Sequence, residues 1–225
     1  MNSTSKAVAV ITALLVLAPA TGRGQTPPAN TGALVNLAGS PPRDTKWDVS
    51  TNNGVTWFQA FQVQNPPGVW QPNTASYSWI SATASGSGAN AIGGIYLFRT
   101  FFDLTGFNAA SASMTFNCAV DNEKPVGSGG YFSLNGGSFG GTCGSGNTTN
   151  FKFAGTQTVN SGFNSGPNEL QFNVWGDNIT DGLVVGNMTL EATSVVPEPA
   201  SMALLATGLV GVFGAARRRR NAPEA

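Results

Sequence analysis

Residues 113–120 read Ser-Met-Thr-Phe-Asn-Cys-Ala-Val, and polar and apolar side chains alternate along most of this stretch. Alternation with a period of two places successive side chains on opposite faces of a β-strand. Residues 169–175, Glu-Leu-Gln-Phe-Asn-Val-Trp, and residues 187–192, Asn-Met-Thr-Leu-Glu-Ala, repeat the pattern. These three stretches predict strands that each turn one face toward a core.

The run from Ile95 to Phe102 is apolar at every position except Arg99 and Thr100. Such a run predicts a central strand that is covered on both sides. Turn sequences rich in Gly, Asn and Pro separate the strand-like stretches, and no capped helical pattern occurs in the middle of the chain. We therefore predict an all-β fold, an antiparallel β-sandwich or jelly roll, over residues 43–193.

The composition limits the possible functions. The 225 residues include no histidine, so histidine-based catalytic triads and histidine-ligated zinc are excluded. Between residues 21 and 195 there are nine acidic and six basic side chains. A mildly acidic domain without a basic patch does not fit a nucleic-acid-binding protein.

The N-terminus predicts a secretory signal peptide over residues 1–20. Lys6 precedes an apolar run from Ala7 to Leu17, and the small residues of Ala18-Pro19-Ala20 follow. A charged start, a short apolar run and a small-residue site are the three parts that signal peptidase requires. Residues 21–42, rich in Thr, Pro, Gly and Asn, are predicted to form a leader or linker.

The C-terminus, residues 194–225, has three parts in a fixed order. Val196-Pro197-Glu198-Pro199 leads into an apolar run at about 200–216, which predicts a short transmembrane helix. Four arginines follow the run, and by the positive-inside rule they leave the body of the protein outside the cytoplasm. These arginines are Arg217, Arg218, Arg219 and Arg220. An ordinary single-pass anchor with a Pro-rich linker is the alternative.

This tail resembles the PEP-CTERM protein-sorting signal of Gram-negative bacteria, which is also described as the ice-binding protein C-terminal type motif. The resemblance implies that an exosortase recognises the Pro-Glu-Pro segment at 197–199 and removes the downstream helix. It also implies delivery to the cell surface or extracellular matrix, with transient anchoring in the inner membrane. Proteins with this tail accompany exopolysaccharide production and biofilms.

The middle of the chain resembles the galactose-binding-like β-sandwich. Four segments carry the resemblance, and they are residues 96–104, 119–122, 132–136 and 165–170. A Gly-rich insert at 128–146, which contains a cysteine, departs from the usual pattern. The resemblance implies a sandwich fold more firmly than it implies a ligand.

The two cysteines, Cys118 and Cys143, predict a disulfide bond. An exported protein enters an oxidising compartment, and a lone pair of cysteines favours a bridge there. The bond would fix the Gly-rich insert to a strand. A catalytic cysteine would need a base, and no histidine is present to supply one.

Three residues are predicted to contact a ligand, namely Trp175, Asp121 and Asn135. Strand alternation places Trp175 on the face opposite Val174, where an indole ring can stack on a sugar unless a loop or second sheet covers it. Asp121, Asn122 and Glu123 crowd one loop, and Asp177, Asn178 and Asp181 crowd another. Oxygen ligands of this density suit Ca²⁺, although neither loop matches a defined calcium motif, so we expect no cofactor and keep calcium as an alternative.

The sequence thus favours an exported, non-catalytic module that binds polysaccharide. The alternatives are a structural or adhesive matrix protein without a small ligand and, less favoured, an extracellular glycosidase. A glycosidase needs two carboxylates facing one another across a cleft, and no pair of acids in the sequence points to such an arrangement.

Overall fold

The computed structural model describes residues 26–33, 35–36, 41–88, 90–122, 129–177, 179–195 and 208–209. The predicted signal peptide, the segment 196–199 and the arginines at 217–220 lie outside these ranges. Of the predicted helix at 200–216, only Gly208 and Leu209 are described, and both are helical. Among the described residues, no helix has the length and apolar character needed to cross a membrane.

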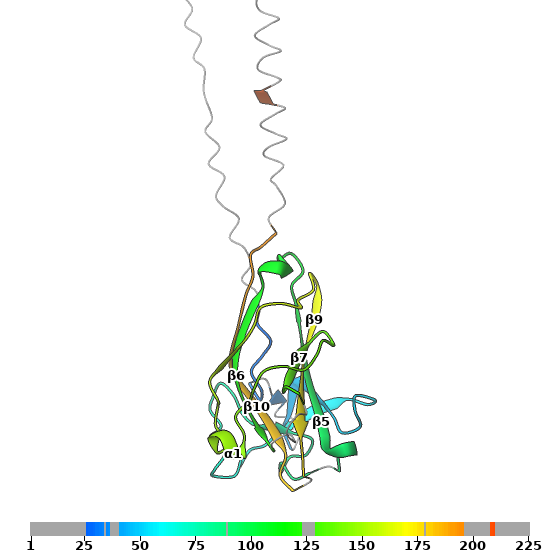
Figure 1. Ribbon diagram of the computed structural model, residues 1–225, viewed down its shortest axis with the longest axis vertical. Helices are drawn as coiled ribbons and strands as arrows, with labels where there is room; N and C mark the ends of the chain where they lie inside the picture. The colour runs from blue at the N-terminus through cyan, green and yellow to red at the C-terminus, as the bar shows by residue number, and fades with distance from the viewer. Residues whose placement is uncertain are drawn as a thin grey trace, which may run out of the picture.

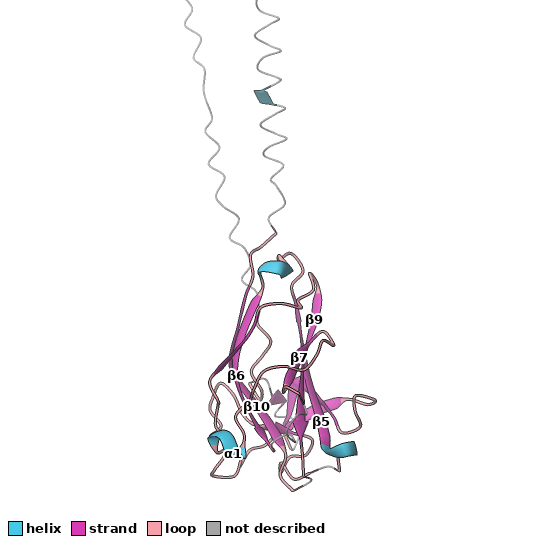
Figure 2. Ribbon diagram, viewed as in Figure 1, coloured by secondary structure: helices cyan, strands magenta, loops and turns pink. Residues whose placement is uncertain are grey.

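Strands dominate the described chain, as Figure 2 shows. The strands are β1 (Val35–Asn36), β2 (Arg43–Ser50), β3 (Phe58–Gln62), β4 (Ile80–Ser81), β5 (Ile95–Asp103), β6 (Ser113–Asp121), β7 (Phe132–Leu134), β8 (Thr156–Val159), β9 (Pro167–Trp175) and β10 (Gly182–Glu191). One short α-helix, α1 (Gly146–Thr149), and two 3-10 turns at Ile92–Gly94 and Ala109–Ser111 complete the fold. The predicted all-β class is confirmed.

The strands form one hydrogen-bonded sheet in the order β7-β9-β5-β2-β3-β4-β10-β6-β8, with β1 paired to β2. Every pairing between strands is antiparallel. Figure 1 shows β6 and β10 on one side of the domain and β5, β7 and β9 on the other. The sheet therefore folds over on itself into two layers that remain joined through β3 and β4, a sandwich-like arrangement with one continuous side.

The core fills the space between the two layers. The Phe116 ring of β6 lies 4.9 Å from the Phe132 ring and 5.6 Å from the Phe172 ring, centroid to centroid, and these two rings come from the opposite layer. The apolar sets predicted from alternation in 113–120, 169–175 and 187–192 are buried. The period-two pattern therefore assigned the inner faces of β6, β9 and the end of β10 correctly.

The prediction that the run 95–102 is covered on both sides is wrong. The inner residues Tyr96, Phe98 and Phe102 of β5 are buried, but Phe101 is 53% exposed on the other face. Although β5 lies between β2 and β9 in the sheet, only one of its faces packs against the opposite layer. Its outer apolar side chains are therefore available at the surface.

The segment that is covered on both sides lies in β10 instead. Leu183 and Val185 face the main core, whereas Val184 faces a second, smaller core outside the sheet. Two stacked indole rings, those of Trp70 and Trp79, form this second core at a centroid distance of 4.1 Å. The chain between β3 and β4 supplies both rings, so this loop covers the outer face of β10.

Part of the predicted leader is bound to the domain. The Thr31 hydroxyl donates to the Ser78 carbonyl at 2.7 Å and accepts from the Val185 amide at 2.9 Å. The Trp47 indole donates to the Ala29 carbonyl at 2.8 Å. Residues 26–33 therefore bridge the two layers on the side of β2 and β10.

Candidate functional site

A pocket of about 320 Å³ opens at the C-terminal end of β9, beside the loop that follows β6 and the loop that leads from β9 to β10. Its described wall contains two aromatic rings together with amide and carboxylate groups, and none of the described lining residues carries a positive charge. The residues that line it are Asn122, Gly146, Asn147, Phe151, Trp175 and Asp177. The predicted ligand-binding residue Trp175 is thus placed in a pocket of mixed aromatic and polar character.

Trp175 is the last residue of β9 and pairs with Ile95 of β5. It is half-buried, because one side of the indole packs over Gly94, where an added Cβ would lie 2.9 Å from the ring. Gly94 also has a φ of +71°, a left-handed conformation that disfavours residues with side chains. The backbone at Gly94 therefore holds the ring in place, and the ring forms part of the pocket wall.

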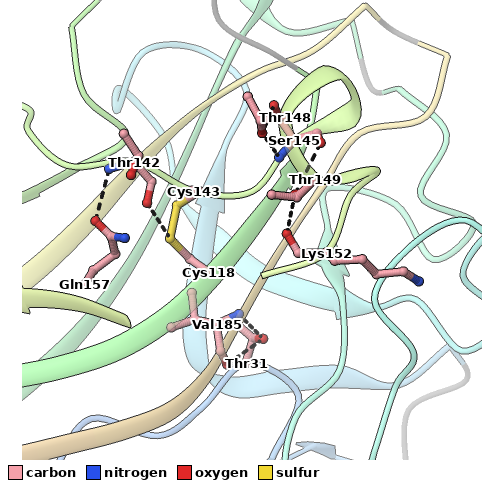
Figure 3. The surroundings of a disulfide bond; sticks show 10 residues. All are labelled: Thr31, Cys118, Thr142, Cys143, Ser145, Thr148, Thr149, Lys152, Gln157 and Val185. Carbon is pink, nitrogen blue, oxygen red and sulfur yellow. Dashed lines mark hydrogen bonds between the residues drawn. A yellow bond between two sulfur atoms is a disulfide. The ribbon is translucent and has the colours of Figure 1, made fainter. Parts of the chain in front are cut away.

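The disulfide bond fixes the second wall. Cys118 and Cys143 are joined with an S–S distance of 2.04 Å, which confirms the predicted pairing (Figure 3). Beside the bond, the Gly144 amide donates to the Cys118 carbonyl at 3.0 Å, and the Val120 amide donates to the Gly144 carbonyl at 2.8 Å. The Gly-rich insert is therefore attached to β6 directly before the pocket.

Helix α1 follows this attachment and places the Phe151 ring. Ser145 and Thr148 form a capping box, the reciprocal pair of contacts that begins a helix. The Phe151 ring lies against Gly146, where a Cβ would come within 2.7 Å of it, and the Phe151 carbonyl accepts from the Gln71 amide at 2.9 Å. The segment that follows the insert thus places the Phe151 ring in the same pocket wall as Trp175 at the end of β9, although the two residues are far apart in the sequence.

The polar groups of the pocket come from the loops after β6 and β9. The backbone N–H of Asn122 donates to the Trp175 carbonyl at 2.7 Å, and this hydrogen bond joins the two loops. The side-chain Nδ2 of Asn122 is buried and has no hydrogen-bond partner among the described residues. Asp177 is exposed, and its carboxylate accepts from the Ile179 amide at 2.8 Å. A buried donor and an exposed acceptor therefore flank the indole.

Asp121, also predicted to contact a ligand, lies behind the pocket and not in its wall. It is 5% exposed, and its Oδ2 accepts from the Trp70 indole at 2.9 Å. Burial raises the pKa of Asp121 to about 7; the Trp70 hydrogen bond opposes this, and the negative charges of Asp181 and Asp177 add to it. Asp121 therefore belongs to the packing between β6 and the second core.

The described residues do not form the calcium site that the alternative interpretation requires. Within the described ranges, no group of three or more Asp, Glu or Cys side chains is arranged to hold a metal ion. Glu123 and Asn178, which that alternative also used, lie outside those ranges.

Asn135 lies at the opposite end of β9 from Trp175. Its side-chain amide donates to the Gly162 carbonyl at 2.7 Å and to the Asn168 side chain at 2.8 Å, and its oxygen accepts from the Glu169 amide at 2.9 Å. These bonds tie the turn after β7 to the start of β9. The structure therefore does not bring Asn135 together with Trp175 and Asp121, and the amide of Asn135 already serves an internal role.

The chain stays attached to the domain up to the start of the predicted sorting tail. The Val195 amide donates to the Gly106 carbonyl at 2.8 Å, and the Asn108 amide donates to the Thr193 carbonyl at 2.8 Å. Comparison with protein-family models matches residues 195–220 to the PEP-CTERM protein-sorting motif. The chain carries a PEP-CTERM sorting signal.

The match implies that the protein is exported and is a substrate of an exosortase. The motif begins at Val195, the last residue of the domain with a described contact to the body. No curated protein and no solved structure matches the chain. The resemblance to the galactose-binding-like sandwich stays a prediction, and the domain must be interpreted from its own residues.

Sequence reasoning missed the aromatic and amide partners of Trp175. Asn147 and Phe151 directly follow the insert, and nothing in their local sequence points to the end of β9. The position of Cys143 is the one signal that could have found them, because a bond to Cys118 brings the insert to the end of β6. Asn122 was noticed only as a possible calcium ligand.

Proposed function

We propose that the β-domain of this exported PEP-CTERM protein is a non-catalytic module that binds polysaccharide at the cell surface or in the extracellular matrix. The observation that carries the proposal is the Trp175 pocket, in which two aromatic rings meet amide and carboxylate groups. In this account signal peptidase and exosortase are processing partners, and an exopolysaccharide is the ligand. The host is a Gram-negative bacterium, and the inner membrane holds the protein only before processing.

The chemistry of the pocket matches that of a sugar. A pyranose ring has apolar C–H faces that pack on an indole or phenyl ring, and its hydroxyl groups exchange hydrogen bonds with amides and carboxylates. The unpartnered Nδ2 of Asn122 supplies a donor whose burial without a partner is costly, so a ligand acceptor would relieve that cost. The volume lies at the small end of the usual range for ligand pockets, which fits a short segment or an end of a chain.

The carboxylates do not support hydrolysis at this site. Glycosidases place two carboxyl groups about 5 to 10 Å apart on either side of the scissile bond. Among the described residues that line the pocket, Asp177 alone carries a carboxylate, and Asp121 is buried behind the wall against Trp70. Binding without bond cleavage is therefore the function that the pocket supports.

Replacement of Trp175 tests the proposal. We expect Trp175→Ala to weaken binding to the recognised member of a glycan panel by about tenfold or more, which corresponds to about 1.4 kcal/mol of lost stacking. Trp175→Phe, which keeps a ring, should lose less. The matched control is Ile179→Ala, because Ile179 is a bulky, 71% exposed apolar residue near the pocket that does not line it.

The outcome also separates the alternatives. Flat binding curves across the panel, for wild type and all variants, would favour a structural or adhesive matrix protein. Release of reducing sugar from any polysaccharide in the panel would instead show a glycosidase.

A further inference from the structure

A second group of side chains lies on the outer side of the sheet, away from the Trp175 pocket. The guanidinium carbon of Arg99 lies 4.0 Å from the centre of the Trp57 ring and 5.0 Å from that of Phe101. The guanidinium carbon of Arg43 lies 3.7 Å from the centre of the Phe61 ring. Each arginine thus lies against at least one aromatic ring. We call these five residues, Arg43, Trp57, Phe61, Arg99 and Phe101, the aromatic–arginine face.

The strand register places the two arginines on the same side. Asp48 of β2 is opposite Arg99 of β5 and also opposite Gln59 of β3. Phe61 is two residues from Gln59, so it lies on the same face, and Arg43 is its cross-strand partner. By the usual sheet spacings, Arg43 and Arg99 are about one strand, roughly 5 Å, apart across the sheet and about 7 Å apart along it.

The arginines retain hydrogen-bonding capacity. Asp48 accepts from the Nε of Arg99 at 3.4 Å, and the Gln59 carbonyl accepts from one terminal nitrogen of Arg43 at 2.9 Å. Within the described part of the chain, no other hydrogen bond engages either guanidinium. Stacking on a ring keeps a guanidinium flat and oriented, so its terminal nitrogens can take a carboxylate in a two-point contact.

We propose that the aromatic–arginine face binds the carboxylate groups of an acidic polysaccharide, a polymer of uronic acid type. Two guanidiniums on neighbouring strands of one face complement charges carried on neighbouring sugars, and the 53% exposed Phe101 ring offers an apolar surface to the sugar faces. The domain is acidic as a whole, with nine acidic and six basic side chains between residues 21 and 195, so the attraction for this polymer comes from the local pair of arginines and not from the net charge.

The position of the face also favours a polymer. Arg99 is opposite Gln171, and Ile95 is opposite Trp175, so the two sites lie on one side of the sheet about 14 Å apart along β5. A chain whose end or short segment occupies the Trp175 pocket can therefore continue toward Arg99. The inference rests on the proposed polysaccharide function and adds the class of polymer.

Calorimetric titration with polygalacturonate, and with uncharged dextran as a comparison, tests the inference. The protein is the full chain expressed with both signals in an exosortase-bearing host and purified in its exported form. We expect Arg99→Lys and Phe101→Ala each to weaken polygalacturonate binding by about tenfold, because each removes a stacked or forked contact. Higher salt should weaken binding of the wild type and of both variants, because both variants keep the positive charges of the face.

Lys46→Ala is the matched control, because Lys46 is an exposed cation on the same strand as Arg43 that stacks on no ring. An equal loss with Lys46→Ala would show diffuse attraction to positive charge and overturn the inference. So would wild-type binding too weak to measure, or binding that depends on Trp175 and is unchanged by Arg99→Lys and Phe101→Ala. In the last case the proposed polysaccharide function survives, whereas absence of binding to every glycan removes both.

Discussion

The two outer faces of the folded sheet share a backbone pattern and differ in what their side chains do. On the layer of β2, β3 and β5, the aromatic–arginine face leaves guanidinium nitrogens and an aromatic ring available. On the layer of β6, β8 and β10, hydroxyl and amide side chains bond to one another across the strands. We call this second group the hydroxyl–amide face, and it consists of Ser113, Thr115, Asn117, Thr156, Asn160, Asn187 and Thr189.

The contacts of the hydroxyl–amide face are mutual. The Thr115 and Thr189 hydroxyls lie 2.7 Å apart, and the Asn187 amide donates to the Asn117 oxygen at 3.0 Å. The side-chain Nδ2 of Asn117 donates to the Thr156 hydroxyl at 3.3 Å. Polar groups that satisfy one another gain little from a new partner, whereas stacked arginines with free nitrogens gain more. The comparison therefore assigns ligand binding to one layer and a closed polar surface to the other.

The largest expected effect comes from removing the disulfide bond, which lies on the β6 layer. The bond closes a loop of 25 residues, so Cys118→Ala with Cys143→Ala should lower the free energy of unfolding by about 3 to 4 kcal/mol. For a domain of this size the melting temperature should fall by roughly 10 °C. Differential scanning calorimetry measures both quantities.

The same double variant sharpens the comparison between layers. Because the disulfide bond anchors the insert that leads directly into Asn147 and Phe151, glycan binding in the Trp175 pocket should weaken at a temperature where the variant is folded. Binding of polygalacturonate at the aromatic–arginine face should change less. Equal loss at both sites would mean that the two sites do not act separately.

A pH dependence of stability is the second effect, and each layer carries a buried acid whose pKa is raised. Burial raises the pKa of Asp121 on β6 to about 7 and that of Asp44 on β2 to about 6. The folded protein therefore holds these protons above pH 4, where the unfolded chain releases them, so stability falls as pH rises toward 7. Each group contributes at most about 1.4 kcal/mol per pH unit.

Urea unfolding at pH 5 and pH 8 measures this dependence. We expect the wild-type domain to be more stable at pH 5, and Asp121→Asn to reduce the difference while keeping an acceptor for the Trp70 indole. Asp103→Asn is the control, because Asp103 is exposed and Thr105 lowers its pKa. A wild-type protein that is more stable at pH 8 would contradict the assignment of these buried acids.

The smallest effect concerns the hydroxyl–amide face itself. Thr115→Val and Thr189→Val, singly and together, should give a coupling energy of about 0.2 to 1 kcal/mol in a double-mutant cycle. Glycan affinity should not change in any of these variants. A clear loss of glycan binding would contradict the assignment of ligand binding to the other layer, because the hydroxyl–amide face would then bind glycan.

The sequence predicted the all-β class, the inner faces of β6 and β9, and the disulfide bond, because alternation and a lone cysteine pair are local signals. It mispredicted the outer face of β5, because an apolar run does not reveal what covers it. Leu183 to Gly186 are buried on both faces only because the excursion carrying Trp70 and Trp79 folds over β10. The neighbours of Trp175 were missed for the same reason, since Phe151 reaches it through the tertiary fold.

The most direct test of the account is a nitrogen-15 NMR titration of the exported protein with the glycan selected from the panel. Of the five tryptophans, Trp47 and Trp79 have indole N–H groups that donate to the Ala29 and Gln71 carbonyls inside the fold. We predict that the indole signal of Trp175 shifts on titration, whereas those of Trp47 and Trp79 and the backbone amides of Thr115 and Thr189 do not. Measurable binding that leaves Trp175 unshifted and moves the Thr115 and Thr189 amides would contradict the account.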